Sequence, residues 1–185
     1  FFALGVWFVP LGVYMSKTLH FDGIVGAAYG MFGLATIVGS LFVGMIADRY
    51  FAVQRMLGVL LLGGAATLFC LSLVRESQTL FLIVVLLHCL FAAAAAPLRM
   101  SIAFANLADA KREFPAVRVW GTIGWIFSGL LIGLWPGATK TVIPMQLGCA
   151  VYLVTGLYAF SLPDTPPRGQ GAPMTAAGVF GLDIM

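Results

Sequence analysis

The stretch SQTLFLIVVLLHCLFAAAAAPL, residues 77–98, decides the fold class of this protein. It runs for 22 residues without a charged side chain, between Glu76 and Arg99. An α-helix needs about 20 predominantly apolar residues to cross the hydrocarbon core of a bilayer. The apolar run is continuous, whereas a strand of a membrane β-barrel alternates apolar and polar residues. We therefore predict a transmembrane helix here.

The composition of the whole chain agrees with a membrane protein. Hydrophobic residues make up 61% and charged residues 9% of the 185 residues, whereas a soluble domain has about 25% charged residues. The mean hydropathy is +1.02. The net charge of +3 comes from basic residues that are scattered singly, so no basic patch suited to nucleic acid is present.

Charged residues divide the remaining chain into runs of similar length. Uncharged stretches of 25, 19, 21 and 23 residues follow Asp22, Arg55, Arg118 and Lys140. Residues 1–16 form a shorter apolar run, which we interpret as a helix that has lost an N-terminal piece. Because only a helix satisfies its own backbone in lipid, we predict an all-α integral membrane protein with six transmembrane helices over residues 1–162.

Basic residues in the connections predict the orientation. The connections after the second, fourth and sixth helices carry six basic residues and those on the other side carry three, and cytoplasmic loops are enriched in Lys and Arg. The six are Arg49, Arg55, Lys111, Arg112, Arg118 and Arg168. We therefore expect a multi-pass protein of the cell membrane whose N-terminus and residues 164 onward are cytoplasmic.

The C-terminal residues read as a linker. Residues 163–173, PDTPPRGQGAP, are rich in proline and glycine, which is typical of a connection between folded parts. The apolar MTAAGVFGLDIM follows and then the sequence stops. We interpret residues 163–185 as a cytoplasmic linker that leads toward a missing C-terminal bundle.

Enzyme and metal signatures are missing from the sequence. Cys70, Cys89 and Cys149 lie in apolar runs without C-x-x-C spacing, so we expect no metal site. There is no nucleophile elbow, no H-E-x-x-H and no phosphate-binding glycine loop. We expect neither an enzyme nor a bound cofactor.

The segment FPAVRVWGTIGW, residues 114–125, carries the candidate binding residues. Pro115 suits the first turn of a helix, which would place Arg118 about one turn inside. Arg118, Thr122 and Trp125 have the spacing i, i+4, i+7 and share one helix face. They offer a guanidinium, a hydroxyl and an aromatic plane, which could hold a ribose and stack on a nucleobase. The same spacing also suits an interfacial arginine that reaches lipid phosphates, and the residues alone do not decide between the two.

The segment GMIADRYFAVQR, residues 44–55, resembles the signature between helices two and three of the major facilitator superfamily. Gly44, Asp48 and Arg49 match its Gly-x-x-x-Asp-Arg pattern, but residues 51–53 do not continue it. In that superfamily the motif is a charge latch that breaks as the transporter changes conformation. The resemblance implies that these three residues are gating residues, with Arg55 as a possible partner.

Four stretches narrow the resemblance to the nucleoside:proton symporters: WFVPLGVYM, FDGIVGAAYG, FPAVRVWGTIGW and SLPDTPP. The chain then resembles the N-terminal six-helix bundle of a twelve-helix carrier that imports nucleosides by proton symport and alternating access. Arg118, Thr122 and Trp125 match nucleoside-contacting positions of that family. Two alternatives remain open: a facilitator half for a sugar or another small polar solute, and a membrane fragment without transport.

Two further polar residues stand in or beside the apolar run quoted first. Arg99 lies about 20 residues past the expected helix start, so we expect it at the membrane interface. His88 falls nearer the middle of the membrane, where we expect a neutral side chain hydrogen-bonded within the bundle. No Asp or Glu lies inside any apolar run, so the proton carrier is expected in the missing half or at Asp48, Asp109 or Glu113.

Overall fold

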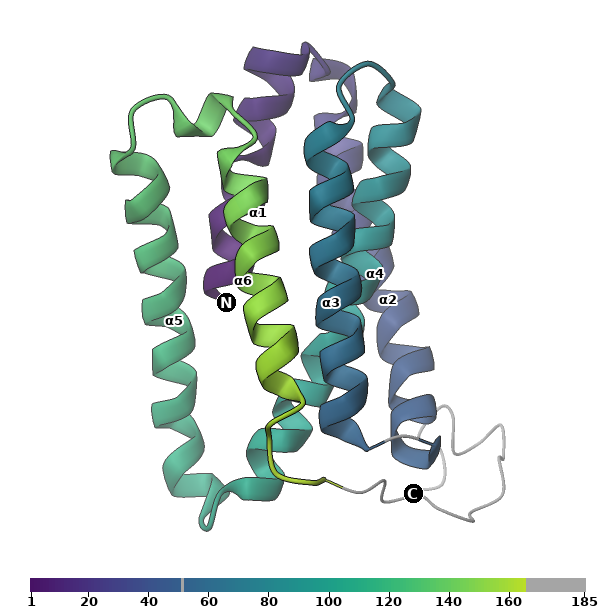
Figure 1. The fold of residues 1–185 in the computed structure, drawn as a ribbon, viewed down its shortest axis with the longest axis vertical. Helices are drawn as coiled ribbons and strands as arrows, with labels where there is room; N and C mark the ends of the chain where they lie inside the picture. The colour runs from purple at the N-terminus through teal and green to yellow at the C-terminus, as the bar shows by residue number, and fades with distance from the viewer. Residues whose placement is uncertain (51, 166–185) are drawn as a thin grey trace.

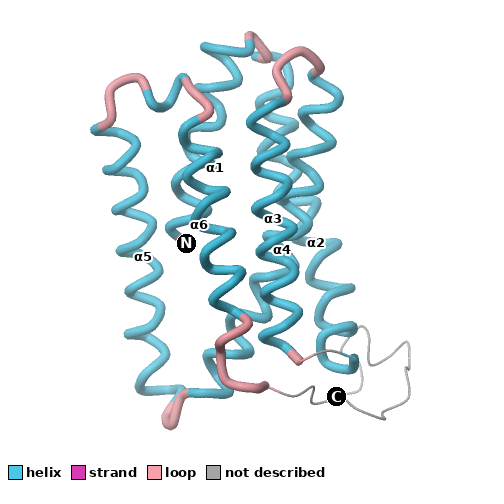
Figure 2. Tube along the Cα trace, viewed as in Figure 1, coloured by secondary structure: helices cyan, strands magenta, loops and turns pink. Residues whose placement is uncertain are grey.

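The computed structural model describes residues 1–50 and 52–165, and for residues 40–50 it describes the backbone alone. All regular structure in these ranges is helical. Within these ranges six α-helices are joined by short connections (Figure 2). The α1–α2 connection contains a π turn and a 3₁₀ turn, and the α5–α6 connection contains a 3₁₀ turn. The α-helices are α1 (Phe2–Tyr14), α2 (Val25–Tyr50), α3 (Val53–Leu73), α4 (Gln78–Asn106), α5 (Ala110–Leu134) and α6 (Ile143–Ala159).

The helices stand side by side in one bundle (Figure 1). α3 packs against α4 and α6, α2 packs against α4, and α1 packs against α5 and α6. In Figure 1, α5 lies at the left edge of the bundle; at the lower end α2 ends, α3 begins and α4 is followed by α5. The segment that follows α6 also reaches this lower end.

The six predicted helices are all present. Five helical segments are long and apolar enough to cross a membrane, and α6 is a shorter apolar helix of 17 residues. The prediction was wrong at two boundaries. α4 continues seven residues past Arg99 to Asn106, and α5 begins at Ala110 instead of Pro115. The charged residues used to mark helix ends therefore lie inside helices at both places.

Glycines allow α3 and α6 to pack closely along a contact that we call the α3–α6 seam. A Cβ on Gly64 would lie 3.1 Å from Tyr152 Cδ1, and one on Gly156 would lie 3.0 Å from Leu62 Cδ2. In a membrane, lipid tails are as apolar as the side chains of a neighbouring helix, so apolar burial alone does little to hold helices together. Small residues help because they let the helix backbones approach each other closely. From the upper to the lower end, the seam pairs Leu68 with Gly148, Gly64 with Tyr152, Leu62 with Gly156 and Gly58 with Phe160.

Because the α3–α6 seam is closely packed, we expect an added methyl group at Gly148 to destabilise the bundle. A Cβ there would lie 3.0 Å from Leu68 Cδ1 and 3.2 Å from Trp7 Cδ1, and both of these side chains are fully buried. Overpacking a core costs about 1–3 kcal/mol, whereas replacing a helical glycine with alanine gains up to about 1 kcal/mol. We expect Gly148→Ala to lower the unfolding temperature of the purified protein in detergent.

Gly133→Ala is the matched control for that measurement. Gly129 and Gly133 have open space beside them within the described structure, so their G-x-x-x-G spacing packs against none of the described elements. The alanine at residue 133 should leave the unfolding temperature unchanged or raise it. Equal effects of the two substitutions would contradict the packing described for the seam.

Candidate functional site

The helix that carries the predicted binding residues starts earlier than the sequence indicated. The side chain of Asp109 accepts hydrogen bonds from the backbone N–H groups of Lys111 and Arg112, at 3.1 and 3.2 Å. An aspartate is a preferred N-cap because it satisfies backbone donors that have no partner in the first turn. Pro115 therefore lies inside α5, and Arg118 lies about two turns from the start of the helix.

Arg118, Thr122 and Trp125 lie along α5 in two different environments. Arg118 and Thr122 are exposed, and no hydrogen bond joins either side chain to another helix in the described part of the chain. The Thr122 hydroxyl is 3.5 Å from the carbonyl oxygen of Arg118, which makes a long bond within the helix. Trp125 is partly buried, and its ring lies 3.3 Å from where a Cβ on Gly5 of α1 would be. Among the described residues, no hydrogen bond or ion pair holds the Arg118 guanidinium.

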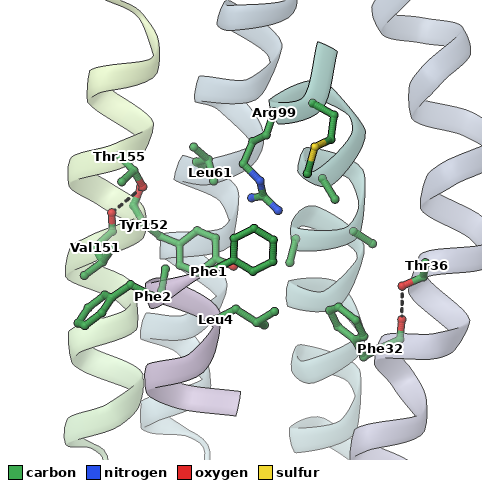
Figure 3. Close-up of a pocket in the computed structure, with 15 residues that line it drawn as sticks. Phe1, Phe2, Leu4, Phe32, Thr36, Leu61, Arg99, Val151, Tyr152 and Thr155 are labelled. Atoms are coloured by element: carbon green, nitrogen blue, oxygen red, sulfur yellow. Dashed lines mark hydrogen bonds between the residues drawn. The ribbon is translucent and has the colours of Figure 1, made fainter. Parts of the chain in front are cut away.

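Arg118, Thr122 and Trp125 do not line the interhelical cavity that lies beside Arg99. This cavity has a volume of about 370 Å³ and is walled by residues of α1, α2, α3, α4 and α6. The Arg99 side chain points into it, toward the rings of Phe1 and Tyr152 (Figure 3). The expectation that Arg99 lies at the membrane interface stays a prediction, but α4 continues seven residues past it and its side chain lines this cavity.

The polar groups of the cavity have complementary hydrogen-bonding roles. The hydroxyl groups of Thr36 and Thr155 donate to carbonyls of their own helices, at 2.8 and 2.6 Å, which leaves each oxygen as an acceptor. A guanidinium, in contrast, can only donate. Arg99 is the polar cavity residue that the sequence analysis missed. Its face on α4 could not be read because alanines occupy positions 92–96 all around the helix.

The first residues of α1 stand between this cavity and α5. Phe1 and Phe2 line the cavity. On their other side, Phe1 packs against Gly121, where a Cβ would lie 2.5 Å from Phe1 Cδ2, and Phe2 packs 3.5 Å from the corresponding position of Gly124. The stretch of α5 between Arg118 and Trp125 therefore adjoins the aromatic wall of the cavity.

His88 lies in the core, as the sequence predicted, and is hydrogen-bonded within the bundle. Its Nδ1 is 3.0 Å from the carbonyl oxygen of Gly64 and 3.0 Å from the hydroxyl oxygen of Thr67, both on α3. Since a carbonyl can only accept, Nδ1 carries the proton. The ring also meets Trp7 and Tyr152 edge to face, at centroid distances of 4.7 and 5.2 Å. His88 thus connects α4 to α1, α3 and α6.

The predicted gating residues lie on both sides of the connection between α2 and α3. Gly44, Asp48 and Arg49 belong to the last turns of α2, but their side chains lie outside the described residues. Arg55 is exposed in the first turn of α3. The gating assignment therefore stays a prediction.

Within residues 1–50 and 52–165, no group of three or more His, Cys, Asp or Glu side chains is arranged to hold a metal ion. The three cysteines are free.

The described chain is a bundle of six apolar helices in which α2 and α3 follow each other closely and an arginine faces an interhelical cavity. This architecture is that of one half of a membrane carrier of the major facilitator type. Comparison with known sequences specifies the family. The profile of the Nucleoside H+ symporter family matches residues 1–185, and the chain belongs to this family.

Individual relatives and solved structures agree with that assignment. The chain is 37% identical over its whole length to YegT of Escherichia coli (strain K12), provisionally named a nucleoside transporter, and covers 44% of it. It is 30% identical to the nucleoside permease NupG of the same organism, over 97% of this chain and 44% of the permease. A crystal structure of NupG superimposes with a TM-score of 0.90 at 28% identity, over 99% of this chain and 46% of that one. The chain thus spans about half the length of the relatives that it matches.

Proposed function

We propose that the full-length protein imports nucleosides together with protons by alternating access, and that Arg118, Thr122 and Trp125 form one wall of its substrate site. In this mechanism the two bundles rock around a site near the middle of the membrane. Arg118 and Thr122 donate hydrogen bonds to the nucleoside, and Trp125 stacks on it or encloses it. Residues 1–162 supply one bundle, and residues 163–185 lead to the other.

The observation that carries this proposal is the match of the whole chain to a nucleoside symporter family, together with the TM-score of 0.90 to a nucleoside transporter. The exposure of Arg118 also supports it. An intramembrane guanidinium is costly unless it is paired, and Arg118 has no partner among the described residues. A ligand, or a side chain of the second bundle, can supply that partner.

The orientation and the gating latch belong to the same proposal. The protein lies in the cell membrane, and the lower end of the bundle faces the cytoplasm, because the basic residues gather at that end. Gly44, Asp48 and Arg49 then form one side of a cytoplasmic latch, and Arg55 is a possible partner. The proton is the coupling ion, and its carrier is a carboxylate of the second bundle or of the cytoplasmic helix ends.

A sugar carrier is the second candidate, because the chain is also 25% identical over 185 residues to the maltose permease of Geobacillus stearothermophilus. A competition assay separates the two. Cells that lack their own nucleoside and maltose carriers and express the full-length protein are given labelled uridine or labelled maltose, each with an excess of the other. We expect uridine to accumulate and maltose not to displace it; accumulation of maltose alone would favour the sugar carrier.

We further propose that the substrate site extends past Phe1 and Phe2 into the cavity, so that Arg99 contacts the nucleobase and determines which nucleosides are preferred. Because its guanidinium only donates hydrogen bonds, it favours a base with an oxo group over a base with an amino group at the same position. We expect the full-length carrier to take up inosine in preference to adenosine, and Arg99→Met to reduce this preference roughly tenfold, as for the loss of one good base contact.

The ratio of inosine to adenosine uptake is measured for the wild type, for Arg99→Met and for Arg75→Met. Arg75 lies outside the cavity, in the connection between α3 and α4, and its substitution should leave the ratio unchanged. If Arg99→Met changes the uptake of both nucleosides equally, Arg99 does not contact the base.

A further inference from the structure

The segment that follows α6 binds the first turn of α3. The side-chain amide of Gln54 donates a hydrogen bond to Oδ1 of Asp164. Its carbonyl oxygen accepts from the backbone N–H of Thr165 at 3.0 Å. The backbone N–H of Val53 in turn donates to the carbonyl oxygen of Thr165 at 3.1 Å. We call this set of three contacts the strap.

The strap supplies a hydrogen-bond acceptor for the backbone N–H groups at the start of α3. Ala52 is the N-cap residue and makes no side-chain hydrogen bond to the first turn, so the first N–H groups of the helix need other partners. Thr165 provides one with its carbonyl oxygen. Gln54 and Thr165 are 4% and 7% exposed, which shows that these polar groups are enclosed, and enclosed polar groups are stable only when hydrogen-bonded.

The strap continues the α3–α6 seam beyond the end of α6. α6 ends at Ala159, but the antiparallel pairing does not stop there. A Cβ on Gly58 would lie 2.6 Å from the ring of Phe160. Four residues further along both segments, Gln54 meets Asp164. The chain after α6 therefore keeps the register of the seam without being helical.

The position of the strap connects two parts of the proposed transporter. α2 ends at Tyr50 and α3 begins at Val53, so Gln54 follows directly on the connection that carries the proposed gating motif. Asp164 and Thr165 begin the segment that leads out of the bundle, within the SLPDTPP stretch. Gln54 and Asp164 therefore join the start of α3 to this segment.

We propose that Gln54 and Asp164 are positioning residues of the transport cycle, which fasten the linker between the two bundles to the first turn of α3. This inference rests on the proposed transport function. Neither residue lines the cavity, so the strap affects the rate at which the bundles rearrange and leaves substrate binding unchanged.

An exchange of donor and acceptor tests the strap in the full-length carrier. Gln54→Glu replaces the donating amide with a carboxylate against Asp164, and two adjacent carboxylates repel each other. Asp164→Asn alone keeps an acceptor for Gln54. In the double variant, the amide introduced at position 164 donates to the carboxylate introduced at position 54, and that carboxylate still accepts from the backbone N–H of Thr165. The matched control is Gln78→Glu, because Gln78 is an exposed glutamine in the first turn of α4 and takes no part in the strap.

Two quantities are measured on each purified variant: the rate of trypsin cleavage after Arg168, identified by fragment mass, and the KM and maximal rate of uridine uptake in vesicles. We expect Gln54→Glu to speed cleavage about tenfold and to lower the maximal rate about tenfold, with KM changed less than twofold. The double variant should return both rates to within about threefold of the wild type.

Three other outcomes would contradict the strap, its positioning role or the proposed substrate. Unchanged cleavage in Gln54→Glu overturns the strap. Faster cleavage with an unchanged maximal rate, or without recovery in the double variant, overturns its positioning role. If the wild type takes up no nucleoside while cleavage follows the expected pattern, the proposed substrate is wrong and the linker is nevertheless fastened as described.

Discussion

Replacing Arg118 with alanine in the full-length carrier should reduce nucleoside uptake about hundredfold. A net hydrogen bond to a charged group is worth about 1.5–3 kcal/mol, and a guanidinium can make two such bonds to one ligand. Arg118 is exposed on α5 and has no hydrogen-bond or ion-pair partner among the described residues. Its removal therefore breaks no contact of the described bundle, and the loss should appear in transport and not in stability.

Uptake of labelled uridine, divided by the amount of carrier in the membrane, measures this effect. Arg112→Ala is the matched control, because Arg112 is an exposed arginine in the first turn of the same helix. Arg118→Lys should retain part of the activity, since an ammonium keeps the charge but not the planar pair of donors. Wild-type uptake by Arg118→Ala would show that this arginine is an interfacial anchor.

The second large effect is expected at His88, where alanine should lower the free energy of unfolding by about 3 kcal/mol. The substitution leaves a cavity where the imidazole ring now packs against Trp7 and Tyr152. It also removes the hydrogen bond to the Gly64 carbonyl. His88 and Trp7 are fully buried and Tyr152 is 3% exposed, so little rearrangement is available to fill the space. Four helices meet at this side chain, and all of them should loosen together.

Thermal unfolding of the purified carrier in detergent measures the change at His88. His88→Asn places an amide N–H near the position of Nδ1 and should recover part of the stability. Cys70→Ala serves as control, since Cys70 is an exposed residue on α3. If His88→Ala unfolds at the wild-type temperature, the contacts around this ring do not hold the four helices together.

Much of the fold follows from the spacing of charged residues, because a charge inside lipid is costly and a long uncharged run is therefore a helix. The same reasoning fails where a charged side chain lies inside a helix and not at its end. Arg99 and Arg118 were used to mark helix ends, yet α4 continues past Arg99 and α5 begins before Arg118. Composition does not tell whether an arginine faces water, lipid or a cavity.

The candidate site could be predicted only in part for a similar reason. Spacing placed Arg118, Thr122 and Trp125 on one helix, and the family resemblance gave them a role, which remains a prediction. The cavity beside Arg99 depends on how five helices pack. The strap joins residues that are 110 and 111 positions apart, and no local pattern in SLPDTPP indicates its partner on α3.

Nucleoside import driven by a proton gradient is the central claim, and accumulation of labelled uridine in vesicles of purified full-length carrier tests it most directly. With the outside more acidic than the inside, uridine should concentrate within the vesicles, and a protonophore should abolish this accumulation. Arg118→Ala vesicles should accumulate almost none. Uridine that only equilibrates across the membrane, whatever the gradient, would contradict proton symport, and vesicles that admit no uridine would contradict nucleoside transport itself.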